Sequence, residues 1–431
     1  MERYSEYKDS GVKWLGEIPS HWEVKRLGSF FFERKEKVSD KDYAPLSVTK
    51  QGIFPQLENV AKTNDGDNRK LVKEGDFVIN SRSDRKGSSG VSGLDGSVSL
   101  INIVLQPRKV LFGPFCNYLL KSYGFIEENY RNGRGIVADL WTTRYDEMKM
   151  IKVAMPSFEE QKNISSYLDA ATSKIDKAIA MQQKMIDLLN ERKQIIIQNA
   201  VTKGLDENVE MKDSGVEWIG MIPKHWEIEP FGKHFTFGKG LPITKANLQE
   251  EGVAVISYGQ VHAKYNLGTS LTETLVRYVS PKYLETHPQC LLNKNDFIFA
   301  DTSEDVEGSG NFAFNDYKDK IFAGYHTVVA RPKDLIYPKY YAYLFKSRAW
   351  KSQIQSLVNG VKVYSIGKRI LKTSTLLIPS ESEQKEIVKV LDLKTAAIEK
   401  SIENISRQIT LLQERKQIII NEVVTGKVKV S

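Results

Sequence analysis

The sequence predicts a mixed α/β (α+β) fold in two pseudo-symmetric halves, each a globular head followed by one long helix. Two internal repeats are the basis of this prediction. Residues 8–23 return as residues 212–227 with 12 of 16 positions identical, and residues 156–202 align without a gap to residues 379–425. Repeats of this kind decide an architecture before any single element is assigned. We therefore expect a first head at 1–155, a first helix at 156–204, a second head at 205–378 and a second helix at 379–431.

The composition agrees with two well-packed heads. The chain has 431 residues, of which 41% are hydrophobic and 10% aromatic, enough for a separate core in each half. Its two cysteines, Cys116 and Cys290, indicate no disulfide framework. The sequence has no apolar run near the roughly 18 residues of a membrane span, and its polar N-terminus has no export signal. These features predict a soluble, cytoplasmic protein, and the formal charge of +8 permits a nucleic-acid partner.

Each half opens with the same aromatic phrase. Its members are Trp14, Pro19, His21 and Trp22 in the first half and Trp218, Pro223, His225 and Trp226 in the second. Such side chains can line a binding cage. We favour the alternative, a packing clasp that anchors the entry of each head to a helix end.

The two heads follow one skeleton: acidic turn, apolar strand, polar loop, glycine, second apolar strand, Arg or Pro stop. The first strand ends at Asn80 and enters a loop rich in Ser, Arg and Lys (81–86), whereas its counterpart ends at Ala300 and enters a loop of Asp, Thr, Ser and Glu (301–305). Arg and Lys reach guanine acceptors and phosphates, while Asp and Glu accept from the cytosine amino group. The contrast predicts one scaffold that reads two base sequences, with ordinary loop drift as the alternative for any single residue.

Further candidate contacts lie in short polar turns. Thr49 follows an apolar strand in the first head, and Tyr258, Gln260 and His262 follow one in the second. Late in the heads, basic residues occur near glycines, where the backbone can approach a phosphate closely. This last set comprises Arg134, Lys362 and Lys368, with Tyr364 beside them. For each of these residues an ordinary turn is the alternative interpretation.

The two repeated segments after the heads predict long helices. Each opens on a Ser-x-x-Glu capping box, at 157–160 and 380–383, and neither contains Pro or Gly before Gly204 and Gly426. Such a helix is about 60 Å long. Apolar or seam positions recur at spacings of three and four, which favours an antiparallel coiled coil of the two copies over a helix lying on its own head. The seam positions are Ile164, Leu168, Ala171, Ile175, Ile179, Gln182, Ile186 and Leu189, and then Ile387, Leu391, Ile398, Ile402, Ile405, Ile409 and Leu412, with Lys394 interrupting.

Both helices end in Glu-Arg-Lys-Gln-Ile-Ile-Ile, at 191–197 and 414–420. Exposed isoleucines are costly in water, so these triplets are expected to be buried. They pack either into the neighbouring head or against a partner subunit.

Motifs for chemistry are missing from the sequence. There is no P-loop, no Asn/Asp-Pro-Pro-aromatic motif, no nucleoside-binding glycine fingerprint and no His/Cys cluster with zinc spacing. The expected chain is a non-catalytic binding protein without a cofactor of its own. Two alternatives are a nuclease or methyltransferase with fused recognition domains, for which the heads and helices leave no room, and a DNA-binding scaffold or repressor unrelated to methylation.

The repeated phrases also resemble a known family, the specificity subunits of type I restriction–modification systems. The likeness covers the whole chain and is carried by Lys-Asp-Ser-Gly-Val-x-Trp-x-Gly-x-Ile-Pro-x-His-Trp from Lys8 and Lys212, by Pro-Ser-x-x-x-Gln from Pro156 and Pro379, and by the Gly-Asp-Phe and Asn-Asp-Phe strands. The resemblance implies two target recognition domains, each reading half of a bipartite asymmetric DNA sequence. It also implies helices that set the spacer and dock two methyltransferase subunits, with S-adenosylmethionine bound by those partners and ATP and Mg²⁺ by restriction (translocase) partners.

The resemblance places the candidate residues on double-stranded DNA. The expected major-groove contacts are Thr49, Asn80, Ser81, Arg82, Ser83, Arg85 and Lys86 in the first head, and Tyr258, Gln260, His262, Asp301, Thr302 and Ser303 in the second. Arg134, Lys362, Tyr364 and Lys368 are expected to contact DNA nearer the helix junctions.

Overall fold

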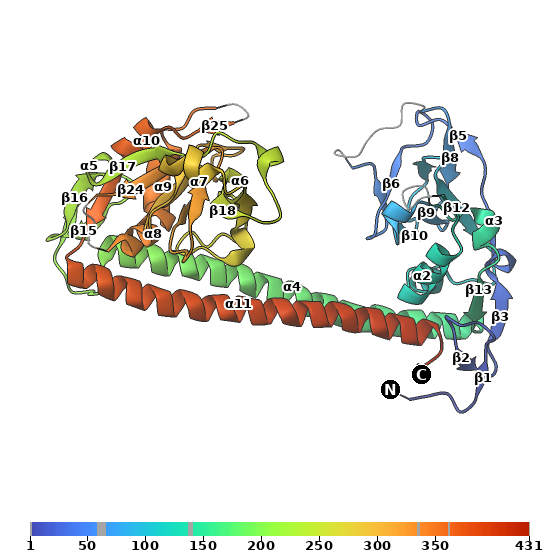
Figure 1. Ribbon diagram of the computed structural model, residues 1–431. Coiled ribbons are helices and arrows are strands. Elements are labelled where there is room, and N and C mark those ends of the chain that lie inside the picture. The colour runs from blue at the N-terminus through green and yellow to red at the C-terminus, as the bar shows by residue number, and fades with distance from the viewer. Residues whose placement is uncertain (1, 58–65, 137–140, 334–336, 361–362, 431) are drawn as a thin grey trace. The chain divides into compact units, whose positions relative to one another are not determined.

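The computed structural model describes residues 2–57, 66–136, 141–333, 337–360 and 363–430 (Figure 1). The chain forms two compact units, residues 1–183 with 405–431 and residues 184–404. Each unit combines one head with the start of the helix that follows that head and the end of the other helix. No helix among the described residues combines the length and apolar character that a membrane crossing needs.

The first head is built on a four-stranded antiparallel sheet of order β10–β9–β12–β4. Its central strands bury the apolar runs Phe77–Ile79 and Ile103–Leu105, as the predicted strand before Asn80 requires. A second sheet has the order β11–β8–β5. The elements are β1 (Tyr7–Asp9), β2 (Glu17–Pro19), β3 (Glu23–Arg26), β4 (Phe31–Glu33), β5 (Lys37–Val38), β6 (Leu46–Val48), β7 (Ile53–Pro55), β8 (Arg69–Val72), β9 (Phe77–Asn80), β10 (Ser89–Val91), β11 (Gly96–Val98), β12 (Asn102–Pro107), α1 (Gly113–Leu120), α2 (Tyr123–Arg131), α3 (Tyr145–Met148) and β13 (Lys152–Met155).

The second head repeats this plan, with a sheet of order β17–β24–β20–β22 and another of order β19–β18–β23. In this second sheet β18 and β23 run parallel. The elements are β14 (Met211–Asp213), β15 (Met221–Pro223), β16 (Glu227–Pro230), α5 (Phe231–His234), β17 (Phe235–Lys239), β18 (Val253–Ile256), α6 (Tyr258–Val261), β19 (Arg277–Val279), α7 (Tyr283–Thr286), β20 (Phe297–Ala300), β21 (Thr302–Ser303), β22 (Phe312–Phe314), β23 (Ile321–Ala323), β24 (Thr327–Pro332), α8 (Pro338–Lys346), α9 (Arg348–Gln355), β25 (Tyr364–Ser365), α10 (Lys368–Thr373) and β26 (Thr375–Ile378).

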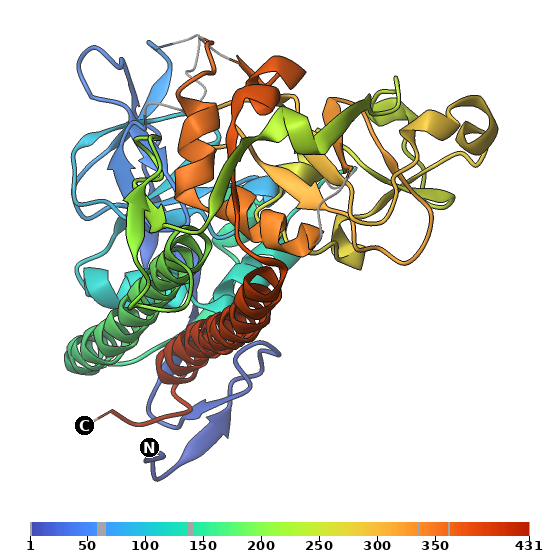
Figure 2. The same ribbon diagram turned by 90° about the vertical axis from the view of Figure 1, so that its left-hand side faces the viewer.

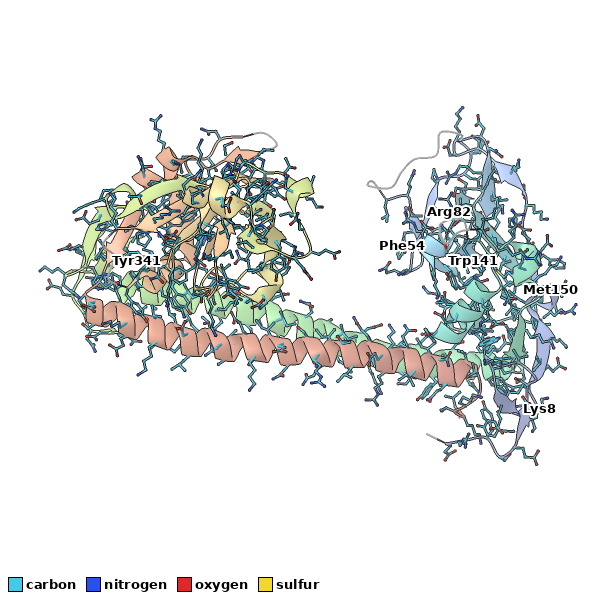
Figure 3. The ribbon with its side chains drawn as sticks, viewed as in Figure 1. Lys8, Phe54, Arg82, Trp141, Met150 and Tyr341 are labelled. Atoms are coloured by element: carbon cyan, nitrogen blue, oxygen red, sulfur yellow. The ribbon has the colours of Figure 1, made fainter. Side chains whose placement is uncertain are left out.

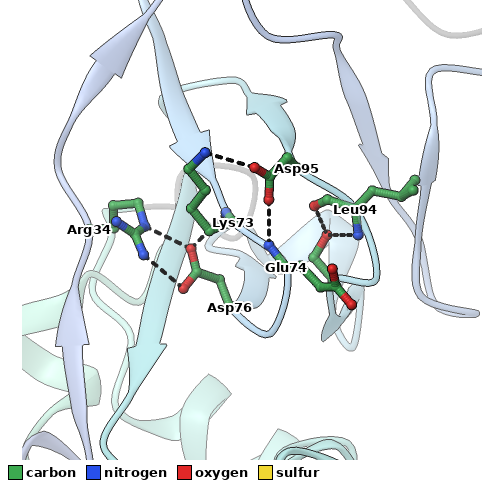
Figure 4. Close-up of polar contacts among 7 residues, drawn as sticks. Arg34, Lys73, Glu74, Asp76, Leu94 and Asp95 are labelled. Carbon is green, nitrogen blue, oxygen red and sulfur yellow. Dashed lines mark hydrogen bonds and ion pairs between the residues drawn. The ribbon is translucent and has the colours of Figure 1, made fainter.

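The acidic turn before the central strand has the same geometry in both heads. Gly75 and Asn295 occupy equivalent positions with φ of 87° and 72°, a conformation that Gly and Asn adopt most readily. The next residue, Asp76 or Asp296, is buried and accepts a hydrogen bond from a backbone N–H three residues earlier. Arg34 holds Asp76 with two hydrogen bonds of 2.7 and 3.2 Å (Figure 4). This shared turn aims the strand that leads into each candidate loop.

The long helices are α4 (Phe158–Lys203) and α11 (Glu381–Val424), and they lie side by side (Figures 1 and 2). None of the predicted seam positions is exposed apart from the interrupting Lys394, where Thr395 is buried in its place. Polar pairs across the seam are Asp176–Lys416 and Gln182–Gln408 in the first unit and Lys193–Glu399 in the second. In the first unit the partner on α11 falls in number as the residue on α4 rises; in the second, Lys193 faces Glu399 and residues 196–203 lie beside Val390, Leu391 and Lys394. The packing within each unit is therefore antiparallel, as predicted.

Each head is fastened to the helix that follows it by one carboxylate. Glu160 accepts hydrogen bonds from Ser157 through one oxygen, completing the capping box, and from His21 (2.8 Å) and Trp22 (3.2 Å) through the other. Glu383 makes the same contacts with Ser380, His225 (2.9 Å) and Trp226 (3.1 Å). We call this arrangement the helix-start anchor. It confirms the clasp interpretation for the His-Trp pair of each repeated phrase, whereas Trp218 is 46% exposed.

The Gln of the Pro-Ser-x-x-x-Gln motif is buried beside the anchor. Gln161 donates to the carbonyl of Pro156 at 3.1 Å, and Gln384 donates to that of Pro379 at 2.9 Å. The side-chain amide therefore holds the residue that enters the helix against its first turn. This contact gives the motif a structural reason.

Each isoleucine triplet is buried at its end and exposed at its start. Ile197 packs into the core of the second unit, and Ile419 and Ile420 pack into the core of the first. The first isoleucine of each triplet, Ile195 or Ile418, points outward with 52% or 56% of its surface exposed. Packing into a head thus explains the burial of the last isoleucines of each triplet, while the first isoleucine stays exposed to solvent.

The anchor makes stability depend on pH. Burial alone raises the pKa of Glu383, but hydrogen bonds from Ser380, Trp226 and His225 outweigh it and lower that pKa to about 2. The stabilisation is therefore complete above about pH 5 and is lost as the pH falls toward 2. We predict that Glu383→Gln lowers the free energy of unfolding at pH 7 by about 1–3 kcal/mol and flattens its decline in acid, measured by denaturation of the full chain.

Glu381→Gln is the matched control, because it removes a carboxylate from the same helical turn that makes only an exposed pair with Lys385. Equal losses in the two variants would contradict the role given to the anchor.

Candidate nucleic-acid interface

The first head has a cavity of about 620 Å³ at the end of its central strand. Four of the predicted contacts line it together: Thr49, Asn80, Arg82 and Arg85. Phe54, on β7, is an exposed aromatic residue in the same head as Arg82 (Figure 3). No sequence pattern selects Phe54, because a single exposed aromatic residue forms no motif.

Segment 141–143 fixes the loop that carries these residues. Ser83 N donates to the carbonyl of Trp141 and Thr143 N to that of Ser81, both at 3.0 Å. Thr142 exchanges two backbone hydrogen bonds with Arg134, so Arg134 is brought to the same place as the 81–86 loop. The indole of Trp141 donates to the carbonyl of Tyr130 at 2.8 Å. Sequence reasoning selected Arg134 but missed the segment that positions it.

Some of the predicted contacts are engaged within the head. Lys86 forms an ion pair with Glu127 at 2.7 Å and lies over the ring of Tyr130. The hydroxyl of Ser81 donates to the carbonyl of Ile101, and that of Thr49 donates to the carbonyl of Gly52 within its turn. In contrast, Arg82 and Arg85 are exposed, and Arg85 pairs with the adjacent Asp84 at 3.6 Å. These two arginines are therefore placed to reach a ligand.

The second head has a corresponding cavity of about 630 Å³. Four of the predicted contacts, Tyr258, His262, Thr302 and Ser303, line it together. The other lining residues include Glu304, Asp305, Glu307 and His326. Asp301 joins the rim through an ion pair of 3.3 Å with His326, an exposed residue whose φ is 53°. A non-glycine residue in this conformation is uncommon and draws attention to the site.

The late segment of the second head pairs with the candidate loop. Strands β21 and β25 place Thr302 opposite Ser365 and Ser303 opposite Tyr364. Tyr364 packs against the apolar core of this head, and its neighbour Val363 lines the cavity. Lys368 follows at the start of α10. Lys362 lies outside the described residues.

Two of the predicted contacts in this head have structural partners. The side-chain oxygen of Gln260 accepts from the N–H of Ser257 at 3.0 Å, as part of a capping box. Ser303 is only 5% exposed, and its hydroxyl lies within the turn formed with Asp305. The short polar sequence at 301–305 could not reveal which hydroxyls turn inward.

The two cavities differ in charge although their frames match. The first is lined by Lys50, Arg69, Arg82 and Arg85 against a single carboxylate, Asp84. The described lining of the second has three carboxylates and two histidines, with no Lys or Arg among them. Within the described part of the chain, no three His, Cys, Asp or Glu side chains gather closely enough to hold a metal ion.

Comparisons with known proteins agree with this architecture. Residues 223–409 match the family described as the type I restriction modification DNA specificity domain. The chain is 25% identical over 98% of its length to the MjaVIII type I restriction enzyme specificity subunit of Methanocaldococcus jannaschii, covering 97% of that protein. It is 23% identical to the EcoKI specificity subunit of Escherichia coli over 48% of this chain and 44% of the relative. In fold it matches a structure from work on complex assembly and conformational transition of the type I R-M system, with a TM-score of 0.68, 15% identity, and 95% of this chain and 99% of that one covered.

Because segment 141–143 holds the 81–86 loop, a substitution at Trp141 should loosen that loop. Trp141→Ala removes the indole hydrogen bond to Tyr130 and loosens the segment that holds residues 81–83. We expect about 1 kcal/mol less local stability, seen as roughly fivefold faster amide hydrogen exchange in peptides covering 80–86. Trp218→Ala, at an exposed tryptophan of the second head, is the control that leaves this exchange unchanged. Unaltered exchange in Trp141→Ala would show that the segment does not hold the loop.

Proposed function

We propose that this chain is a type I restriction–modification specificity subunit that reads a bipartite, asymmetric DNA sequence, one half with each head. The observation that carries the proposal is the pair of matching cavities with opposite charge. A shared frame with different loop chemistry is what recognition of two unlike half-sites requires. In this proposal the chain acts in the cytoplasm and performs no catalytic step itself.

The chemistry of each cavity suggests the base edges that it reads. Arg82 and Arg85 suit the O6 and N7 acceptors of guanine, whereas Glu304 suits the exocyclic amino group of cytosine. Each good base contact contributes about 1–3 kcal/mol of discrimination. Basic residues near the rims, Lys50 and Lys368 among them, supply the salt-dependent attraction to phosphates.

The helices have two roles in the proposal. They set the spacer between the half-sites, and linking the two heads raises the affinity through effective concentration. They also dock two methyltransferase subunits. Support for two equivalent docking sites comes from apolar residues exposed at corresponding points of both helices, namely Leu188 with Leu411 and Ile195 with Ile418.

Chemistry on DNA belongs to the partners in this scheme. The methyltransferase subunits bind S-adenosylmethionine and flip the target base out of the duplex. Restriction subunits, with ATP and Mg²⁺, associate through them. This chain selects the site at which those reactions occur.

Exchange of one loop tests whether each head reads its own half-site. Replacing residues 81–86 with the corresponding loop of another specificity subunit should change only the first half of the methylated motif. The chain is expressed with its methyltransferase partner, and the motif is determined from the modified bases in the DNA. A change in both halves, or in neither, would rule out the assignment of this loop to the first half-site.

Matched insertions test the spacer. Seven residues are added to α4 after Ile179 and to the facing part of α11 between Gln408 and Lys416, which preserves the seam period. The added rise of about 10 Å corresponds to roughly three base pairs, so the spacer should lengthen by that amount. The same seven residues inserted at 205–209, after α4 has ended, serve as the control and should leave the spacer unaltered. An unchanged spacer in the helix variant would refute the role of the helices in setting it.

A further inference from the structure

Lys351 is a lysine of α9 that is partly buried in the second head. Its ammonium donates a hydrogen bond of 2.6 Å to the side-chain oxygen of Asn311, just before β22. Burial lowers the pKa of Lys351, and the nearby Asp305 carboxylate opposes this. A buried lysine is costly unless its hydrogen bonds serve the fold or the site.

Two groups set the direction of a series of hydrogen bonds: the Lys351 ammonium at one end, which only donates, and the Thr302 carbonyl at the other, which only accepts. An ammonium can only donate, so Asn311 must turn its oxygen toward Lys351 and its NH₂ toward His262. The NH₂ lies 3.1 Å from Nδ1 of His262, which therefore accepts. The ring proton is then on Nε2, which lies 2.8 Å from the carbonyl oxygen of Thr302 and donates to it.

This series of hydrogen bonds ends beneath the candidate recognition loop. Thr302 belongs to β21, and the loop that follows packs over the His262 ring. A side chain at Gly308 would lie 2.4 Å from the hydroxyl of Ser303 and 3.3 Å from the ring of His262, so the fit is close. Gln355, also on α9, donates to the carbonyl of Glu307 at 3.3 Å. Helix α9 thus holds the loop at two points.

We propose that Lys351, Asn311 and His262 form a positioning relay that fixes the 302–307 loop for reading the second half-site. His262 was expected from sequence to contact DNA, and the relay gives it a different role: both ring nitrogens are engaged within the head. The inference rests on the proposed function for what the loop reads. The relay itself is a property of the free protein and can be measured without DNA.

The first arm of the test is spectroscopic. In full-length protein labelled with ¹⁵N-histidine, the His262 ring, identified with His262→Gln, should carry its proton on Nε2. Asn311→Asp presents an oxygen to Nδ1 and should place a proton there, shifting the Nδ1 resonance. A proton that stays on Nε2 alone in Asn311→Asp, or that lies on Nδ1 in the unmodified protein, would overturn the relay.

The second arm measures recognition. Lys351→Met keeps the stem but removes the ammonium, so Asn311 loses the hydrogen bond to its side-chain oxygen and is held within the relay only by His262. We expect about a tenfold loss of discrimination against base changes in the second half-site, with the first half-site unaffected, in competition binding by the chain assembled with its methyltransferase partner. The control is Lys346→Met, which removes another buried ammonium, one that donates to the carbonyl of Leu267 and takes no part in the relay.

The outcomes separate the two ideas. Loss confined to Lys351→Met and to the second half-site supports the positioning role. Equal loss in both lysine variants, or in both half-sites, would show that Lys351 contributes only to the general stability of the head, and it would overturn the positioning role. If the unmodified complex discriminates no split site at all, the proposed function fails, while the histidine signal still decides whether the relay exists.

Discussion

The rest of the structure depends on the carboxylate that joins each head to its helix. In each half, one glutamate caps the first turn of a long helix with one oxygen and accepts from a tryptophan and a histidine of the head entry with the other. A capping contact satisfies helix N–H groups that have no partner within the helix. Here the same side chain also fixes where the head begins. The repeated head entry and the repeated helix start therefore contact each other through this glutamate, which explains why both repeats occur in each half.

Because the anchor holds the frame of each head, the recognition loops of the two heads can differ in sequence. The frame of each head is held by the anchor, the acidic turn and the apolar sheet, none of which uses a residue of the 81–86 or 301–305 loops in its core. Loop residues can change charge without loss of the fold, as surface substitutions usually do. The opposite charge of the two cavities follows from this separation between frame and loop, and it gives one architecture two recognition chemistries.

The regular features of the fold could be predicted from the sequence, because they depend on local period and on the repeat. The seam from Ile164 to Leu189 follows from spacings of three and four, and the clasp follows from the repeated aromatics. That Glu160 serves both the cap and the clasp was hidden, since its partners lie about 140 positions away in the sequence. In the candidate site, Arg82 and Thr302 could be selected from the sequence because they are polar residues that follow apolar strands. Thr142 and Lys351 could not, because they act through contacts between residues distant in the sequence, which no short motif predicts.

The measurement that tests the central claim most directly is single-molecule sequencing of genomic DNA from the host with and without this gene. The account predicts one split methylation motif, with two unlike halves and a fixed spacer, that disappears when the gene is deleted. A continuous motif that depends on the gene would contradict two-headed reading. Persistence of every motif after deletion, with the partner subunits expressed, would contradict a role for the chain in directing methylation.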